Sequence, residues 1–263
     1  MSAPHKKSDE CFILIKAQPH RSSKYFETVC CAGVGRDGKW RRQYPVPYRI
    51  LEGAQKFSRW DWIKYDYVDG KDDKRVESQK VLANSLEVTG SIKRSERANF
   101  LNPLIRSSFE EANQRGESLT LLRPQKIILN HREKTLDELR DETRKHEELA
   151  NQLSLFDPTA KPLKPCPMQF ILNWVDQDGK KRQHENDDWE TSAAYNRFER
   201  MYGHDEAIKI LKRKYEEEYF SAGLALGFST HSRRNATYGM NNQWLLVGLV
   251  RLDVVSQDDL FIG

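Results

Sequence analysis

Four prolines stand between residues 157 and 167, and this segment constrains the chain most, because no helix or central strand can run through it. A charged stretch with helical spacing precedes the prolines, and a strand-like run follows them. The sequence therefore predicts a mainly β N-terminal domain over 1–130. A helix and proline-rich linker follow over 131–167, and a smaller α/β domain covers 168–263.

Apolar runs and alternating patterns predict the strands of an α+β fold. In the first half these strands cover 11–17, 28–34, 39–44 and 60–68. The turn at 35–38 predicts a hairpin between the second and third strands, and a small barrel-like sheet would accommodate all four. Residues 71–80 are expected to be a hydrophilic connector. In the second half, strands are expected at 168–175, 225–229 and 243–252, polar residues at 180–188, and helices around 195–202 and from 205 onward.

A narrow apolar stripe predicts a helix before the linker. Its members recur at steps of three and four: Leu136, Leu139, Thr143, His146, Leu149 and Leu153. Such a helix could pack on a domain surface or pair with a partner helix. The short repeat favours packing on the surface, because a coiled coil needs several heptads.

The run Gln152-Leu153-Ser154-Leu155-Phe156 resembles the motif with which bacterial replication and repair proteins dock onto the DNA sliding clamp. In such a peptide Leu155 and Phe156 would fill an apolar pocket, while the Gln152 amide would donate a directional hydrogen bond. Leu153 belongs to the same candidate motif. The alternative is that Leu149, Leu153 and Phe156 form the last helical turn and pack on the protein's own core.

Basic and aromatic residues gather between residues 36 and 64, where eight lysines and arginines face three acidic residues. Cations suit phosphates and flat rings suit base stacking, so this cluster predicts nucleic-acid binding. The alternative is that the rings belong to the core and the charges to a solvated face. The candidate residues are Arg41, Arg42, Tyr44, Arg49, Trp60, Trp62 and Lys64.

A second donor-rich stretch lies between the two last predicted strands, where binding loops are common. Its candidates for contacts with phosphates or base edges are His231, Arg233, Arg234 and Asn235. A solvated loop would explain the same residues.

Enzymatic signals are weaker. Asp66, Asp69 and Glu77 could hold Mg²⁺ in a nuclease, although nothing downstream completes such a site. Crowded polar residues (His184, Glu185, Asp187 and Asp188) lack the spacing of metal ligands and fit a surface better. Cys30 and Cys31 lie in an apolar strand, where a thiol is usually inert. No metal or cofactor is therefore expected, and catalytic residues remain unknown.

The composition favours a soluble cytoplasmic protein. Charged residues make up 31% of the chain and hydrophobic residues 38%, and no apolar run reaches the length of a membrane helix. Four cysteines without a paired spacing are expected to be reduced. Membrane partners are therefore not expected.

Two sets of residues resemble an uncharacterised family of bacterial proteins. The opening carries Glu27-Thr28-Val29-Cys30-Cys31-Ala32-Gly33, Tyr44-Pro45-Val46-Pro47-Tyr48-Arg49 and Trp60-Asp61-Trp62-Ile63, and the end carries Trp244-Leu245-Leu246-Val247-Gly248-Leu249. The resemblance covers most of the chain but implies no known activity.

Taken together, these patterns predict a bacterial protein that binds DNA or RNA and reaches DNA through the sliding clamp, in phage defence, repair or mobile-element biology. One alternative is a metal-dependent nuclease or nucleotide-modifying enzyme. The other is a protein-interaction module that binds no nucleic acid.

Overall fold

The computed structural model describes residues 5–22, 26–48, 51–70, 73, 75–153, 164–230 and 244–253, with backbone alone for 20–22, 26–28 and 149–153. Two compact units divide the chain, and each is built from two stretches. Unit 1 comprises Met1–Ile92 and His131–Gln169, and unit 2 comprises Lys93–Asn130 and Phe170–Gly263.

This division differs from the predicted boundary at residue 130. The strand over Leu119–Leu122 pairs with the strand over Leu224–Thr230, so residues 93–130 join the C-terminal sheet. Pairing between residues so far apart leaves no local trace in the sequence. The α+β class and the mainly β character of the N-terminal region are confirmed.

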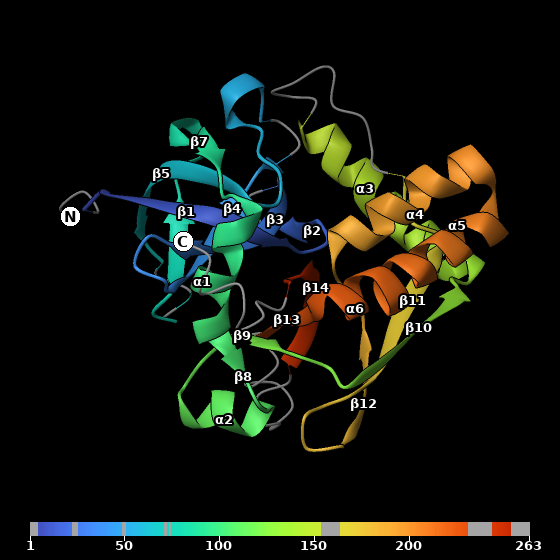
Figure 1. Cartoon of the computed structure of the whole chain (residues 1–263). Coiled ribbons are helices and arrows are strands. Elements are labelled where there is room, and N and C mark those ends of the chain that lie inside the picture. The colour runs from blue at the N-terminus through green and yellow to red at the C-terminus, as the bar shows by residue number, and fades with distance from the viewer. Residues whose placement is uncertain are drawn as a thin grey trace. The chain divides into compact units, whose positions relative to one another are not determined.

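Unit 1 is organised around a closed sheet (Figure 1). Its strands are β1 (Lys7–Lys16), β2 (His20–Ser22), β3 (Phe26–Gly35), β4 (Trp40–Val46), β5 (Asp61–Asp69), β6 (Ser78–Val81) and β7 (Glu87–Ser91). The order is β1-β3-β4-β6-β5-β7, and β1 also pairs with β5, which closes a five-stranded barrel. Strands β4 and β6 run parallel, whereas the other pairs in the barrel are antiparallel.

The predicted hairpin is confirmed as β3 and β4, joined by a turn in which Gly38 has a φ of 73°. β6 was not predicted and lies at the end of the expected connector. Its sequence, Ser-Gln-Lys-Val, is polar at three of four positions, and it becomes a strand because both neighbours supply pairing edges.

Helix α3 (Leu136–Leu153) packs against β2 and β3 within unit 1. Its start is a reciprocal capping box. Thr135 Oγ1 accepts a hydrogen bond from the backbone N–H of Glu138 at 3.2 Å, and Glu138 Oε2 accepts one from the backbone N–H of Thr135 at 2.7 Å. The helix therefore packs on the surface of its domain, which is the favoured one of the two predicted alternatives. Leu136, which was predicted to belong to the apolar stripe, is 70% exposed.

Unit 2 contains two sheets. The first has the order β14-β13-β9-β8, and β13 is buried along its whole length. The second has the order β10-β11-β12. The strands are β8 (Ile105–Arg106), β9 (Leu119–Leu122), β10 (Lys126–Glu133), β11 (Met168–Val175), β12 (Lys181–Glu185), β13 (Leu224–Thr230) and β14 (Trp244–Arg251). Strand β12 was expected to be a polar loop; its side chains alternate between exposed and half-buried as it pairs with β11.

The helices of unit 2 include the two that were predicted, around 195–202 and from 205 onward. They are α1 (Arg97–Leu101), α2 (Phe109–Gln114), α4 (Trp189–Tyr202), α5 (His204–Lys212), a π-helical segment over Arg213–Tyr219, and α6 (Phe220–Gly223). Gly203 separates α4 from α5 with a φ of 84°, a conformation that favours glycine. None of the described helices is both long and apolar enough to cross a membrane.

Candidate nucleic-acid interface

Successive side chains of β4 point to opposite faces of the barrel wall. Gln43 is fully buried and points into the barrel, so Arg42 and Tyr44 on either side of it belong to the outer face. The predicted basic and aromatic residues therefore divide between two environments.

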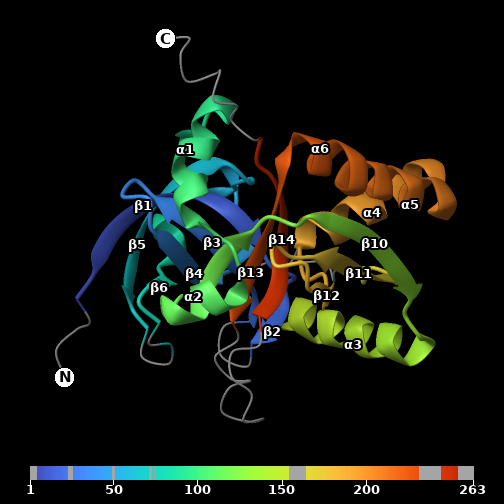
Figure 2. The ribbon, with the colours of Figure 1, turned by 60° about the horizontal axis from the view of Figure 1, so that its bottom comes forward.

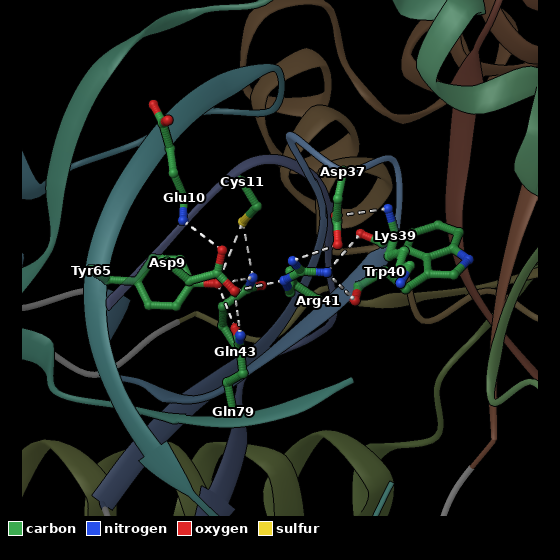
Figure 3. Close-up of polar contacts among 10 residues, drawn as sticks. All are labelled: Asp9, Glu10, Cys11, Asp37, Lys39, Trp40, Arg41, Gln43, Tyr65 and Gln79. Carbon is green, nitrogen blue, oxygen red and sulfur yellow. Dashed lines mark hydrogen bonds and ion pairs between the residues drawn. The ribbon is translucent and has the colours of Figure 1, made fainter. Parts of the chain in front are cut away.

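Arg41 is held at one end of the interior network (Figure 3). Its Nε donates to Asp9 Oδ2 at 2.6 Å and its Nη2 to Asp37 Oδ2 at 3.1 Å. Burial alone would lower the pKa of the guanidinium, but the hydrogen bonds and charges of the two aspartates raise the pKa above its ordinary value. Arg41 thus neutralises carboxylates of its own barrel.

The interior network continues from Asp9 to the centre of the barrel. Gln79 Nε2 donates to Asp9 Oδ2 at 2.7 Å, and the Tyr65 hydroxyl donates to Gln79 Oε1 at 2.5 Å. Gln43 Nε2 donates to the Tyr65 hydroxyl and to Cys11 Sγ, both at 3.0 Å (Figure 3). Polar residues from four strands are thereby connected inside the barrel.

Two titratable groups in this network, the Cys11 thiol and the Tyr65 hydroxyl, are kept neutral. Burial raises the pKa of the Cys11 thiol to about 12 and raises the pKa of the Tyr65 hydroxyl well above its usual value. Because a thiol attacks as its thiolate, this shift makes Cys11 a poor nucleophile at neutral pH. Burial also raises the pKa of Cys31, which likewise fits a structural thiol.

Arg42 lies on the outer face but is only 4% exposed. Its Nη2 is 3.3 Å from Glu77 Oε1, and that carboxylate is 10% exposed. Beside this pair, Asp73 accepts hydrogen bonds from Arg75 and Ser78. These bonds outweigh the effect of burial and hold the pKa of Asp73 at about 2. Arg42 is therefore committed to an internal ion pair.

The two candidate tryptophans are also engaged. Trp62 is 5% exposed, lies edge-on to Phe12, and carries the Arg36 guanidinium 3.5 Å from its ring centroid. Trp60 is half-buried, stacks on Phe12 at 6.3 Å, and has a φ of 79°. Arg36 was counted among the local charges but was not singled out as a candidate. Its place directly after the end of β3 gave no signal of the stacking.

Tyr44 and Lys64 differ from the other described candidates because they reach solvent. Tyr44 is 38% exposed on β4, and Lys64 is exposed on β5. Of the remaining candidates, Arg49, His231, Arg233, Arg234 and Asn235 lie outside the described residues.

The clamp-like motif straddles the end of α3. Gln152 and Leu153 belong to the last helical turn by their backbone, and Leu155 and Phe156 lie outside the described residues. Docking on the sliding clamp therefore stays a prediction.

An aromatic cluster that the sequence did not predict lies in unit 2. It surrounds His184, whose ring centroid is 5.0 Å from that of Phe228, 5.8 Å from that of Phe109 and 5.9 Å from that of Trp174. Burial, followed by the charge of Arg182, lowers the pKa of His184 to about 4. His184 is therefore a neutral, half-buried member of a packed cluster and not a surface residue.

Asp188 is also buried, with no exposed surface. Its Oδ1 caps α4 by accepting from the backbone N–H of Glu190 at 3.1 Å, and its Oδ2 accepts from the backbone N–H of Leu249 at 3.0 Å. Asp188 thus joins the start of α4 to β14. The expectation of a surface position is corrected for this residue, because its carboxylate caps α4 and also accepts a hydrogen bond from β14.

The carboxylates considered for a magnesium site lie in separate ion pairs. Asp66 pairs with Lys6 at 2.7 Å, Asp69 with Lys7 at 2.7 Å, and Glu77 with Arg42. Within the described part of the chain, no three His, Cys, Asp or Glu side chains gather in a way that could hold a metal ion.

Comparison with protein families matched two models. Residues 7–107 match the domain of unknown function DUF8758, and residues 103–261 match the domain of unknown function DUF8757. The second match covers more than half of the chain, which therefore belongs to the DUF8757 family. No curated protein gave a significant match. Neither description assigns an activity.

Proposed function

We propose that unit 1 binds single-stranded nucleic acid, DNA or RNA, on the outer face of its barrel. The order and directions of the strands carry this proposal. Numbered within the barrel, the strands run 1-2-3-5-4 and close on strand 1, with strands 3 and 5 parallel. This is the Greek-key arrangement of the OB-fold, which binds oligonucleotides or oligosaccharides across strands 2 and 3 and the adjoining loops.

The side chains on this face support nucleic acid as the ligand. Strands 2 and 3 of the barrel are β3 and β4, and Tyr44 of β4 offers an exposed ring on the outer side. Base stacking on such rings tolerates any sequence. In the sequence, the segment between β1 and β3 also carries Arg21 and Lys24, whose charges suit phosphate.

Binding of labelled oligonucleotides to the full chain tests the proposal. At low salt, fluorescence anisotropy should show binding to a 20-nucleotide single strand. The affinity should fall steeply as salt is added, because binding releases the cations condensed on the phosphates. Tyr44→Ala should weaken binding by about fivefold or more, since one stacked base contributes about 1–3 kcal/mol.

The matched control is Tyr202→Ala, which removes a tyrosine that is 55% exposed on α4 of unit 2. It should bind as the wild type does. Absence of salt-sensitive binding by the wild type, with a control protein binding under the same conditions, would reject the proposal. Equal weakening by both substitutions would remove Tyr44 from the interface.

The sliding clamp is the partner we propose for bringing this activity to DNA, in replication-linked repair or in defence against phage or mobile elements. The support for this partner is the sequence of residues 152–156 alone.

A further inference from the structure

Arginines from two distant parts of the sequence meet at the end of β14 in unit 2. Arg94 begins the short 3-10 helix that precedes α1, and Arg251 is the last residue of β14; α1 and β14 can be followed in Figure 2. Arg94 Nε donates to Asp253 Oδ2 at 2.6 Å, and Arg251 Nε donates to Asp253 Oδ1 at 3.0 Å. Two guanidinium groups therefore converge on the two oxygens of one carboxylate.

A third arginine gives this cluster an excess of positive charge. Arg97 is the first residue of α1, and it lies close enough to Arg94 and Asp253 for both charges to act on its pKa. Burial lowers the pKa of the Arg97 guanidinium, and repulsion from Arg94 lowers it further. Three arginines and one aspartate leave a surplus of two positive charges. The neighbouring side chains of Lys93 and Glu96 are both exposed and carry opposite charges.

The Asp253 carboxylate is held weakly in this cluster, although its backbone is anchored. Its side chain is 38% exposed and that of Arg94 is 60% exposed. Exposed ion pairs of this kind contribute at most about 1 kcal/mol. The backbone is fixed one residue earlier, where the N–H of Leu252 donates to the carbonyl of Gly223 at 2.8 Å. The carboxylate can therefore leave the arginines without unfolding the end of β14.

We propose that this cluster binds a phosphate group, which replaces the Asp253 carboxylate between Arg94 and Arg251. Guanidinium groups bind phosphate through paired N–H donors, which makes arginine well suited to such a site. A terminal phosphate carries about 1.5 to 2 negative charges at pH 7, so it matches the surplus charge better than one carboxylate does. The group belongs to a small phosphorylated compound or to a nucleic acid. The site lies within unit 2 and does not depend on binding by the barrel.

Calorimetric titration of pyrophosphate into the full chain tests this site with two variants of opposite effect. Arg94→Gln removes a guanidinium group and should weaken binding by about tenfold. Asp253→Asn removes the competing carboxylate and should tighten binding by about fivefold, because the site is then open for a larger fraction of the time. Damage to the fold would weaken binding in both variants, so it cannot produce this pair of results.

Two exposed charges of unit 2 give matched controls. Arg200→Gln changes α4, and Asp178→Asn changes the turn between β11 and β12. Each should alter the affinity for pyrophosphate by less than about twofold, because solvent screens exposed charges that lie outside the site. Absence of pyrophosphate binding by the wild type and Asp253→Asn would overturn the inference. So would equal affinities of Arg94→Gln and Arg200→Gln, or an Asp253→Asn protein that binds no more tightly than the wild type.

A labelled 20-nucleotide single strand identifies the source of the phosphate. If Arg94→Gln weakens binding of both pyrophosphate and the oligonucleotide relative to Arg200→Gln, the site accepts phosphates of nucleic acid. If it weakens binding of pyrophosphate alone, the ligand is a small phosphorylated compound. Tyr44→Ala should leave pyrophosphate binding unchanged. A wild-type protein that binds pyrophosphate but no oligonucleotide would reject the proposed function of the barrel and support this separate site.

Discussion

The indole N–H of Trp174 donates a hydrogen bond to Nδ1 of His184 across 3.0 Å. Nδ1 therefore acts as an acceptor, and the proton of the neutral ring resides on Nε2. Protonation would place a second N–H at Nδ1, directed at the indole donor, in a half-buried site beside the Arg182 charge. The contact between Trp174 and His184 consequently requires a neutral ring.

This requirement predicts a specific dependence of stability on pH. The folded-state pKa of about 4 lies below the ordinary value of 6.5, so the unfolded chain takes up the proton first as the pH falls. The contribution of His184 is full above pH 6.5, declines as the pH falls toward 4, and is constant below that. The decline amounts to about 3 kcal/mol.

Urea unfolding at a series of pH values measures this effect. His184→Gln should flatten the decline between pH 6.5 and 4, because glutamine does not titrate. His5→Gln, which changes an exposed histidine of unit 1, should leave the decline as in the wild type. If the free energy of unfolding depends on pH in the same way for the wild type and His184→Gln, this ring does not cause the loss of stability between pH 6.5 and 4.

The ion pair between Arg42 and Glu77 predicts that Arg42 acts through stability. Arg42→Ala would remove the cation that pairs with the Glu77 carboxylate, which is 10% exposed, and we expect the free energy of unfolding to fall by about 3 kcal/mol. Lys64→Ala, which removes an exposed cation from β5, should change it by less than about 0.5 kcal/mol. Chemical unfolding of both variants measures these free energies. An Arg42→Ala protein that is as stable as the wild type but has lost oligonucleotide binding would show that Arg42 contacts the nucleic acid.

The hydroxyl of Tyr65 supports the interior network and yields a third prediction. Tyr65→Phe removes the donor to Gln79 Oε1 and the acceptor for Gln43 Nε2 inside the barrel. Gln79 Oε1 then loses its donor and Gln43 Nε2 keeps only Cys11 Sγ as an acceptor, so we expect a loss of about 1–3 kcal/mol in the free energy of unfolding. Tyr67→Phe, at a half-buried position two residues along β5, should cost under about 0.5 kcal/mol. Equal unfolding midpoints for the two variants would contradict the structural role of Tyr65.

Local signals explain which parts of the fold could be predicted. The turn at Gly38 and the apolar runs on both sides define the β3–β4 hairpin without reference to the rest of the chain. The spacing of Leu139, Thr143 and His146 likewise defines α3. β6 and β12 escaped prediction because their residues are mostly polar and their partners, not their own sequences, make them strands.

The candidate site was harder to predict because ionic partners are set by the tertiary fold. Arg42 and Glu77 are 35 residues apart, and Arg41 and Asp9 are 32 residues apart. Nothing near either arginine in the sequence distinguishes a cation that neutralises its own barrel from one that meets phosphate. Gln43 shows the same limit: its polar side chain gave no sign that it lies fully inside the barrel.

The motif at residues 152–156 predicts a direct interaction with the bacterial sliding clamp. Leu155 and Phe156 are its apolar anchors, and anchors of this kind typically contribute about 2 kcal/mol each to binding. A Leu155→Ala/Phe156→Ala variant should therefore lose at least about thirtyfold in affinity for purified clamp, measured by surface plasmon resonance.

Leu136→Ala is the control for this experiment, because it removes a leucine that is 70% exposed at the opposite end of the same helix. It should bind the clamp as the wild type does, since the change spares residues 152–156. Wild-type protein that fails to bind the clamp would exclude this partner. If instead the double variant binds as tightly as the wild type, the contact must use another surface, and residues 152–156 are then better explained as the end of a helix that packs on its own barrel.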